Sequence, residues 1–258
     1  MERPPRRALA LACAAAVVVT LGAVPVTSAD ATTAKPKPAA TAAPPGVRGT
    51  APKPKPKPVG NATFPLSKGE VGPLVLDAQK RLQWLGYSVR LNSTMDAKTL
   101  SAVSAFRTKF SLGSGTTVTT RIYASLTSLT KTNGVLPRGC RTGLVICVDK
   151  TQKLVRLVRS NKVVVVSDAR FGSDANPTVE GTFHVFSKAR DHTSSLYHTW
   201  MPLALFFAGG EAVHFSPYFK RDGYNGHSHG CVNVRDWNKQ TLIFNSAPIG
   251  TKVVVYRS

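Results

Sequence analysis

A histidine and a cysteine 17 positions apart are the residues of this chain best suited to covalent chemistry. They lie in the stretch from His214 to Arg235, which contains the run Ser228-His229-Gly230-Cys231-Val232-Asn233. A cysteine thiolate is a strong nucleophile, and a neighbouring imidazole can take the thiol proton. Gly230 leaves the backbone beside the sulfur open to a substrate, and backbone N–H groups at such a turn can hold an oxyanion. The pattern favours acyl transfer through a thioester.

Two other interpretations fit the same residue types. The Ser-His-Gly-Cys run also suits a turn that carries a buried, inert cysteine. His229, Cys231 and His214 also suit a zinc site, although the usual Cys-x2–4-Cys and His-x3–5-His spacings are missing. We therefore assign no metal ligands. A buried, unreactive Cys231 is kept as the alternative interpretation.

The run around Cys231, with His214 upstream, closely resembles the signature of the L,D-transpeptidase catalytic domain, the YkuD-like family. That signature is a His, a gap of just over a dozen residues, and then Ser/Thr-His-Gly-Cys-hydrophobic-Asn. Residues 172–185 look like its Thr-Pro-x-Gly-x-Phe-x-Val segment, and residues 201–214 look like the strand pair that leads to the upstream His. The resemblance implies a catalytic domain over residues 138–258 with a mainly β, sandwich-type fold.

The resemblance also implies roles at the centre of the site. Cys231 would be the nucleophile and His214 the base that takes its proton. The backbone carbonyl of Phe215 would orient His214, and the bulky Phe215 side chain would narrow the site. No metal or organic cofactor is implied, and members of this family are typically acylated by carbapenems.

Supporting roles follow from the same resemblance. His229 would shape the loop and the oxyanion hole or be a satisfied structural histidine, with Gly230 beside the sulfur. Ser228 and Asn233 would hold the loop by hydrogen bonds. Arg235 is expected to be solvated rather than to bind a substrate carboxylate. We expect three further histidines to be structural or to lie at the surface: His184, His192 and His198. Three other residues are expected either to line the substrate groove or to belong to the core: Tyr197, Trp200 and Met201.

The implied substrate is peptidoglycan. Cys231 would attack the carbonyl after the third residue of a donor stem peptide and expel the terminal D-alanine, and transfer to an amine of a neighbouring stem would give a 3→3 cross-link. If water takes the acyl group instead, the enzyme is an L,D-carboxypeptidase. A non-catalytic protein that binds the wall is the third hypothesis.

Short β-branched runs after Pro137 predict the strands of this domain. Turn residues such as Asp149-Lys150-Thr151-Gln152 separate them, as in a β-meander. A short helix is expected at 236–245. The expected strands are 144–148, 154–158, 163–166, 182–186 and 251–256.

Residues 64–132 predict a small three-helix domain. Apolar residues recur at spacings of three and four, Gly86 is expected to end the first helix, and Asp96 is expected to cap the second. The pattern resembles the peptidoglycan-binding domain type 1, although Asn92-Ser93-Thr94-Met95 replaces that family's usual Gly. Gln79, Trp84 and Tyr87 are expected as exposed ligand contacts, and a spacer without a ligand is the alternative.

The amino terminus has the features of a secretory signal over residues 1–29. Three arginines precede an apolar run from Ala8 to Val26, and small residues follow at Ala29 and Ala31. The protein is thus expected to be secreted into the cell wall or extracytoplasmic space. An uncleaved membrane anchor remains an alternative, and Cys13 lies too early in the run for a convincing lipoprotein site.

Residues 30–63 are rich in Ala, Pro and Lys and predict a disordered, extended linker. The whole chain carries a formal net charge of +21, from 34 Lys and Arg against 13 Asp and Glu. Such a charge attracts polyanions. For an exported protein we expect anionic cell-wall polymers, through the Lys-Pro repeats, rather than nucleic acid.

Removal of the signal would leave three cysteines. Cys140 and Cys147 are close in sequence and are the economical pair for a disulfide in an oxidising compartment. Cys231 is then the odd, free thiol. The alternative is that all three are reduced.

Overall fold

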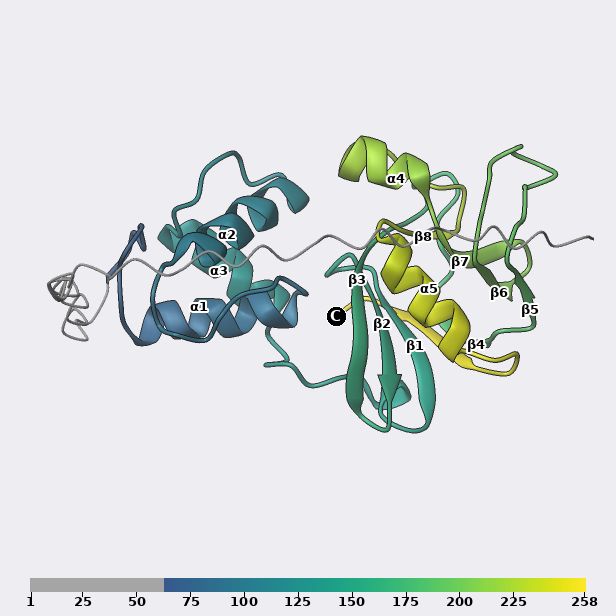
Figure 1. The fold of residues 1–258 in the computed structure, drawn as a ribbon, viewed down its shortest axis with the longest axis horizontal. Coiled ribbons are helices and arrows are strands. Elements are labelled where there is room, and N and C mark those ends of the chain that lie inside the picture. The colour runs from purple at the N-terminus through teal and green to yellow at the C-terminus, as the bar shows by residue number, and fades with distance from the viewer. Residues whose placement is uncertain (1–62) are drawn as a thin grey trace, which may run out of the picture. The chain divides into compact units, whose positions relative to one another are not determined.

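The computed structural model describes residues 63–258, so the predicted signal and nearly all of the predicted linker lie outside the described residues. The first part of the described chain holds helices α1 (Pro73–Trp84), α2 (Ala97–Lys109) and α3 (Thr120–Leu129), shown in Figure 1. Within residues 63–258, no helix has the length and apolar character needed to cross a bilayer.

Local sequence accounts for the helix ends. Asp96 caps α2, since its carboxylate accepts a hydrogen bond from the Thr99 backbone N–H at 2.8 Å. Gly86 follows α1 with a φ of 88°, the left-handed conformation that ends helices. The inward faces share one apolar cluster, which includes Val75, Leu82, Val103, Phe106, Ile122 and Leu126.

Gln79 is a structural residue, and its expected role as an exposed ligand contact is wrong. Its side chain is fully buried in α1. The amide donates to Asn92 Oδ1 and to the Thr94 carbonyl oxygen, each at 2.8 Å, and its oxygen accepts from the Asn92 and Ser93 backbone N–H groups. Burial of the Gln79 amide carries little energetic penalty because each of its polar atoms has a hydrogen-bond partner. Gln79 therefore fixes the segment that replaces the glycine of the resembled family.

The remainder of the described chain is mainly β, as predicted. Within residues 63–258, nine strands form one sheet in the order β4-β9-β1-β2-β3-β8-β7-β6-β5. The β1–β9 and β7–β8 pairs are parallel and the other pairs are antiparallel. The elements are η1 (Arg138–Cys140), β1 (Leu144–Asp149), β2 (Leu154–Arg159), β3 (Lys162–Arg170), β4 (Gly181–His184), β5 (Ser187–Ala189), β6 (Ala204–Ala208), β7 (Glu211–Phe215), α4 (Pro217–Asp222), η2 (Gly223–Asn225), β8 (Val232–Val234), α5 (Trp237–Ser246) and β9 (Lys252–Tyr256).

The sheet curls, so that its two halves enclose a common core. Phe183 of β4 and Phe207 of β6 are far apart in the strand order, yet their ring centroids lie 5.6 Å apart. Ile146, Val213 and Val232 come from both halves and belong to the same buried cluster. Ile243 and Phe244 of α5 join this cluster as well. The sandwich implied by the resemblance is thus one curved sheet.

The helices and the sheet belong to one compact unit and share buried polar contacts. The Arg156 guanidinium lies 4.4 Å from the Trp84 ring centroid and donates to the Trp84 carbonyl at 3.0 Å. Gln152 accepts a second hydrogen bond from Arg156 at 2.6 Å. Trp84 is half-buried here, and the Tyr87 hydroxyl is buried too. Both side chains are thus only partly exposed, and no described contact tests their expected role as ligand contacts.

A buried ion pair also joins α2 to β3. The Lys109 side chain is 1% exposed, and its ammonium lies 2.8 Å from a carboxylate oxygen of Asp168. Arg235 approaches the other oxygen of Asp168 at 3.7 Å. A buried ammonium is costly without a partner, so Asp168 holds this contact together.

Asp168→Asn should lower the free energy of unfolding by about 3 kcal/mol, because it leaves the Lys109 ammonium buried without a counter-charge. Lys109→Met removes the charge itself and should cost clearly less. Urea unfolding of both variants measures the difference. An equal loss in the two variants would contradict this account of the ion pair.

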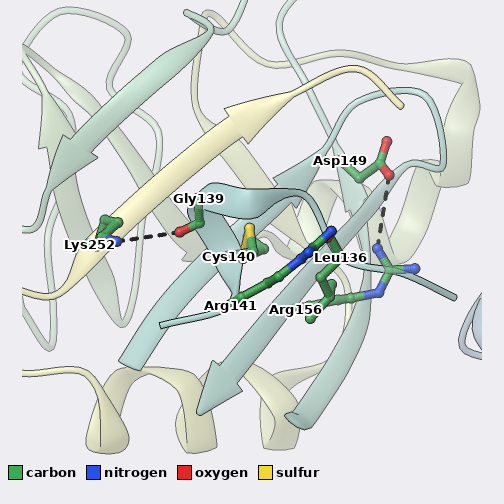
Figure 2. The surroundings of a disulfide bond; sticks show 8 residues. Leu136, Gly139, Cys140, Arg141, Asp149, Arg156 and Lys252 are labelled. Atoms are coloured by element: carbon green, nitrogen blue, oxygen red, sulfur yellow. Dashed lines mark hydrogen bonds and ion pairs between the residues drawn. A yellow bond between two sulfur atoms is a disulfide. The ribbon is translucent and has the colours of Figure 1, made fainter. Parts of the chain in front are cut away.

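The structure joins Cys140 of η1 to Cys147 of β1 by a disulfide, the pairing that the sequence suggests. Both residues are fully buried. Figure 2 shows two of the surrounding polar contacts: the Gly139 carbonyl accepts from Lys252 at 3.4 Å, and Arg156 lies 4.0 Å from Asp149. Arg141 also donates to the Leu136 carbonyl at 2.7 Å. The disulfide thus anchors the segment that connects the helices to β1.

The double variant Cys140→Ala/Cys147→Ala should lose about 2–3 kcal/mol of unfolding free energy, since the bond closes a short loop. Urea unfolding under non-reducing conditions measures the loss, and Cys231→Ala is the matched control that keeps the bond. Equal stability of the double variant and the control would mean that the bond adds nothing.

Candidate active site

The short strand β8 aligns the residues of the predicted site. It pairs with β7, so that His214 lies opposite Asn233, and with β3, so that Arg170 also lies opposite Asn233. Directly paired residues project from the same face of a sheet. Cys231 precedes Asn233 by two positions, which is the period of one strand face. The register therefore gathers a thiol, an imidazole, an amide and a guanidinium on one face.

The loop before Cys231 is held by close backbone contacts. The Ser228 hydroxyl donates to the Cys231 carbonyl at 2.6 Å, and the Ser228 N–H donates to the Phe171 carbonyl at 2.8 Å. Gly172 lies so close that an added Cβ would meet the Asn176 carbonyl oxygen at 1.8 Å. This close approach requires glycine. The structure thus gives Ser228 the loop-holding contacts expected of it.

His214 is buried and has a defined tautomer. Its Nδ1 lies 2.7 Å from the Phe215 carbonyl oxygen. A carbonyl only accepts, so Nδ1 carries the hydrogen and Nε2 is the basic nitrogen. Burial lowers the pKa of His214 to about 4, although the Phe215 carbonyl and the Asn233 side chain partly oppose the shift. The imidazole is therefore neutral at neutral pH and can accept a proton.

The environment of Cys231 favours the protonated thiol. Burial raises the pKa of the Cys231 thiol to about 11, and the nearby Glu211 carboxylate adds to the shift, while a backbone contact from Ala212 opposes it. Sγ contacts the Gly210 carbonyl at 3.9 Å. No hydrogen bond within residues 63–258 joins Sγ to His214. The surroundings of Cys231 in the free protein therefore favour the thiol over the thiolate.

A cavity of about 540 Å³ opens over Cys231 and His214. One wall comes from the segment between β5 and β6, and the opposite wall comes from the segment between β7 and β8. The lining includes Arg170, His192, Tyr197, Trp200, Met201, Phe206, Gly210, Glu211, His214, Tyr218, His227, His229, Cys231 and Asn233. The volume suits a peptide-sized ligand.

One aromatic contact joins the two walls of this cavity. The Tyr197 ring stacks on His229, with centroids 3.9 Å apart and planes within 9°. The Trp200 ring nitrogen donates to Asp191 at 2.6 Å. Tyr197 and Trp200 are exposed, and Met201 is nearly buried. Tyr197, Trp200 and Met201 therefore all line the cavity. His229 lines it as well.

Arg170 is a buried cation that the sequence analysis did not single out. Its side chain is 6% exposed and lines the cavity. One nitrogen donates to the Gly223 carbonyl at 3.0 Å, whereas Nε has no partner. No salt bridge in the described part of the chain includes Arg170. In the sequence, Arg170 follows the β-branched run 163–166 after three intervening residues and precedes Phe171-Gly172, and no motif marks it.

Three expectations about neighbouring residues need correction. The Phe215 side chain does not narrow the site, since it is buried and packs edge-on against Trp237, with centroids 5.1 Å apart. Successive residues of a strand face opposite sides, and His214 takes the cavity side. Arg235 is only partly solvated, because it pairs with Asp168. His192 lines the cavity rather than the general surface.

Comparison with known proteins identifies the domain. Residues 143–255 match the model of the YkuD family, the L,D-transpeptidase catalytic domain. This part of the chain therefore matches a YkuD-type L,D-transpeptidase catalytic domain, and the rest of the chain lies outside the match. The chain matches no curated protein.

Solved structures of L,D-transpeptidases have a similar fold. The enzyme from Stackebrandtia nassauensis is 21% identical with a TM-score of 0.50, and the match covers 75% of this chain and 97% of that one. The enzyme from Xylanimonas cellulosilytica is 29% identical with a TM-score of 0.48, and the match covers 76% of this chain and 100% of that one.

A neutral His214 imidazole and a Cys231 thiol with a raised pKa predict a steep pH dependence of thiol reactivity. Alkylation of Cys231 by iodoacetamide should rise about tenfold per pH unit between pH 7 and pH 9, because the thiolate fraction grows until the pH reaches the thiol pKa. The rate of mass gain measures this, with Cys231→Ser as the unreactive control. A rate already at its plateau at pH 7 would instead indicate a preformed thiolate–imidazolium pair.

Proposed function

We propose that the protein is an exported L,D-transpeptidase that forms 3→3 cross-links in peptidoglycan through an acyl-enzyme on Cys231. One observation carries the proposal. The β7–β8 register puts the basic Nε2 of His214 and the Cys231 thiol on the same face, at the base of a peptide-sized cavity. This is the nucleophile and base arrangement of covalent acyl transfer.

The first half-reaction follows from the protonation states. As Sγ attacks the carbonyl after the third stem residue, the thiol proton passes to His214 Nε2. The sulfur–carbon bond forms, the bond to the D-alanine nitrogen breaks, and His214 returns the proton to that leaving amine. Backbone N–H groups of the loop at 228–231 would stabilise the oxyanion. The products are a thioester and free D-alanine.

Arg170 would assist the donor. The leaving D-alanine carries a terminal carboxylate, and the buried guanidinium of Arg170 lies on the cavity wall and forms no salt bridge within residues 63–258. Guanidinium groups bind carboxylates strongly when both are shielded from water. A donor with a free carboxyl end is therefore the preferred substrate of this proposal.

The helical unit would contribute support more than substrate contact. The fully buried Gln79 is engaged inside the protein, so any binding of glycan or peptide must use other residues of the helical unit. Export is supported by the apolar amino terminus and by the buried disulfide, which suits an oxidising compartment.

A carbapenem tests the nucleophile directly. The described chain should gain one covalent adduct, seen by intact mass, and Cys231→Ala should gain none. His214→Gln should still fold and be acylated about 100-fold or more slowly, since general-base catalysis typically contributes that much. No adduct on a folded wild type would favour the non-catalytic, wall-binding hypothesis.

A further inference from the structure

Glu211 is a carboxylate on the wall of the catalytic cavity that the proposed first half-reaction does not use. It begins β7, directly after Gly210, whose carbonyl lies 3.9 Å from the Cys231 sulfur. Its Oε1 lies 3.1 Å from the point where a Cβ on Gly230 would be. The Glu211 carboxylate therefore borders the loop that carries the nucleophile.

This carboxylate has no cation of its own. Its Oε2 accepts from the Val179 N–H at 3.2 Å, and no salt bridge within residues 63–258 includes it. Lys150 is the cation that influences it, but the Lys150 ammonium is held by Glu180 and by the Thr178 carbonyl, each at 2.8 Å. Half-buried in the cavity wall, Glu211 is thus a negative charge without a counter-charge.

The position of the Glu211 carboxylate beside Cys231 disfavours the first half-reaction. A negative charge beside Cys231 disfavours the thiolate, and it contributes to the raised pKa of the Cys231 thiol. Burial also raises the pKa of Glu211 itself. The other titratable groups that line the cavity are Arg170, His192, Tyr197, His214, Tyr218, His227, His229 and Cys231, with Asp222 already paired to Arg221. The Arg170 guanidinium donates to the Gly223 carbonyl, and no salt bridge within residues 63–258 joins it to Glu211. None of these balances Glu211, which indicates that its partner comes with a substrate.

We propose that Glu211 binds the primary ammonium group of the acceptor beside the thioester and so directs the acyl-enzyme toward an amine rather than water. This proposal rests on the proposed function and deepens it. The attacking nitrogen must come within about 3–3.5 Å of the thioester carbonyl carbon, which is bonded to Sγ. A carboxylate one residue from a direct Sγ contact is placed to hold that nitrogen.

In the second half-reaction the acceptor amine displaces the Cys231 sulfur from the acyl group. The bound ammonium gives one proton to the neutral His214 imidazole and becomes a nucleophilic amine. The new carbon–nitrogen bond forms, the carbon–sulfur bond breaks, and the second nitrogen proton goes to the departing sulfur. The products are the amide cross-link and the Cys231 thiol, and His214 releases the first proton to water.

The test is the partition of one acyl-enzyme between two products. A lysine-containing stem tetrapeptide serves as both donor and acceptor, and mass spectrometry gives the ratio of cross-linked dimer to hydrolysed tripeptide. Glu211→Gln should lower this ratio about tenfold, and Glu211→Asp should lie between. Asp77→Asn is the matched control, because it changes a carboxylate outside the cavity that Arg81 already holds at 2.6 Å, and its ratio should equal that of the wild type.

Two further measurements separate binding from a structural role. Hydroxylamine is an uncharged nucleophile at pH 7.5, so Glu211→Gln should use it as well as the wild type does. The same variant should react faster with iodoacetamide at pH 7.5, because removal of the negative charge favours the Cys231 thiolate. A structural defect would instead slow dimer formation, hydrolysis and alkylation together.

The outcomes are distinct. An unchanged partition ratio in Glu211→Gln, or an equal fall of dimer and tripeptide, would overturn the role of Glu211. A wild type that forms neither dimer nor tripeptide would overturn the proposed function itself. A wild type that forms tripeptide but no dimer would make the enzyme a carboxypeptidase and would also remove the acceptor role.

Discussion

The arrangement of the site depends on a strand of three residues. Val232–Val234 forms β8 between β3 and β7, and its side chains Val232 and Val234 are fixed in the core. A shift of one residue would turn Asn233 into the core and the valines into the cavity. The burial of two valines therefore sets the register that brings Cys231, His214 and Arg170 together.

Burial also sets the resting protonation of the site. The same enclosure that orients His214 keeps its imidazole neutral, and it keeps Cys231 a thiol. A neutral pair is cheaper to bury than an ion pair without excellent geometry. The resting thiol is also less open to oxidation, since the thiolate is the reactive form. Reactivity thus appears when a substrate carbonyl can accept the sulfur as the proton leaves.

Sequence patterns predicted those features that short stretches of chain determine. The Asp96 cap, the end of α1 at Gly86 and the β-branched strands follow from neighbouring residues, and the Cys231 motif is itself local. Gln79 and Phe215 were misjudged because their surroundings come from segments far away in sequence. Arg170 and Glu211 were not singled out for the same reason. A charged residue in a strand gains meaning only when the sheet shows which cavity it borders.

The helical unit has a physical connection to the site through β3. Lys109 pairs with Asp168, and Arg170 stands two positions further along the same strand face. Beyond it, Phe171 and Gly172 hold the loop that carries Cys231. Movement of α2 against β3 would therefore strain the segment that positions Cys231. The helices thus support the sheet that carries Cys231. Because the buried Lys109 ammonium needs the Asp168 carboxylate, the ion pair fixes the position of α2 along β3.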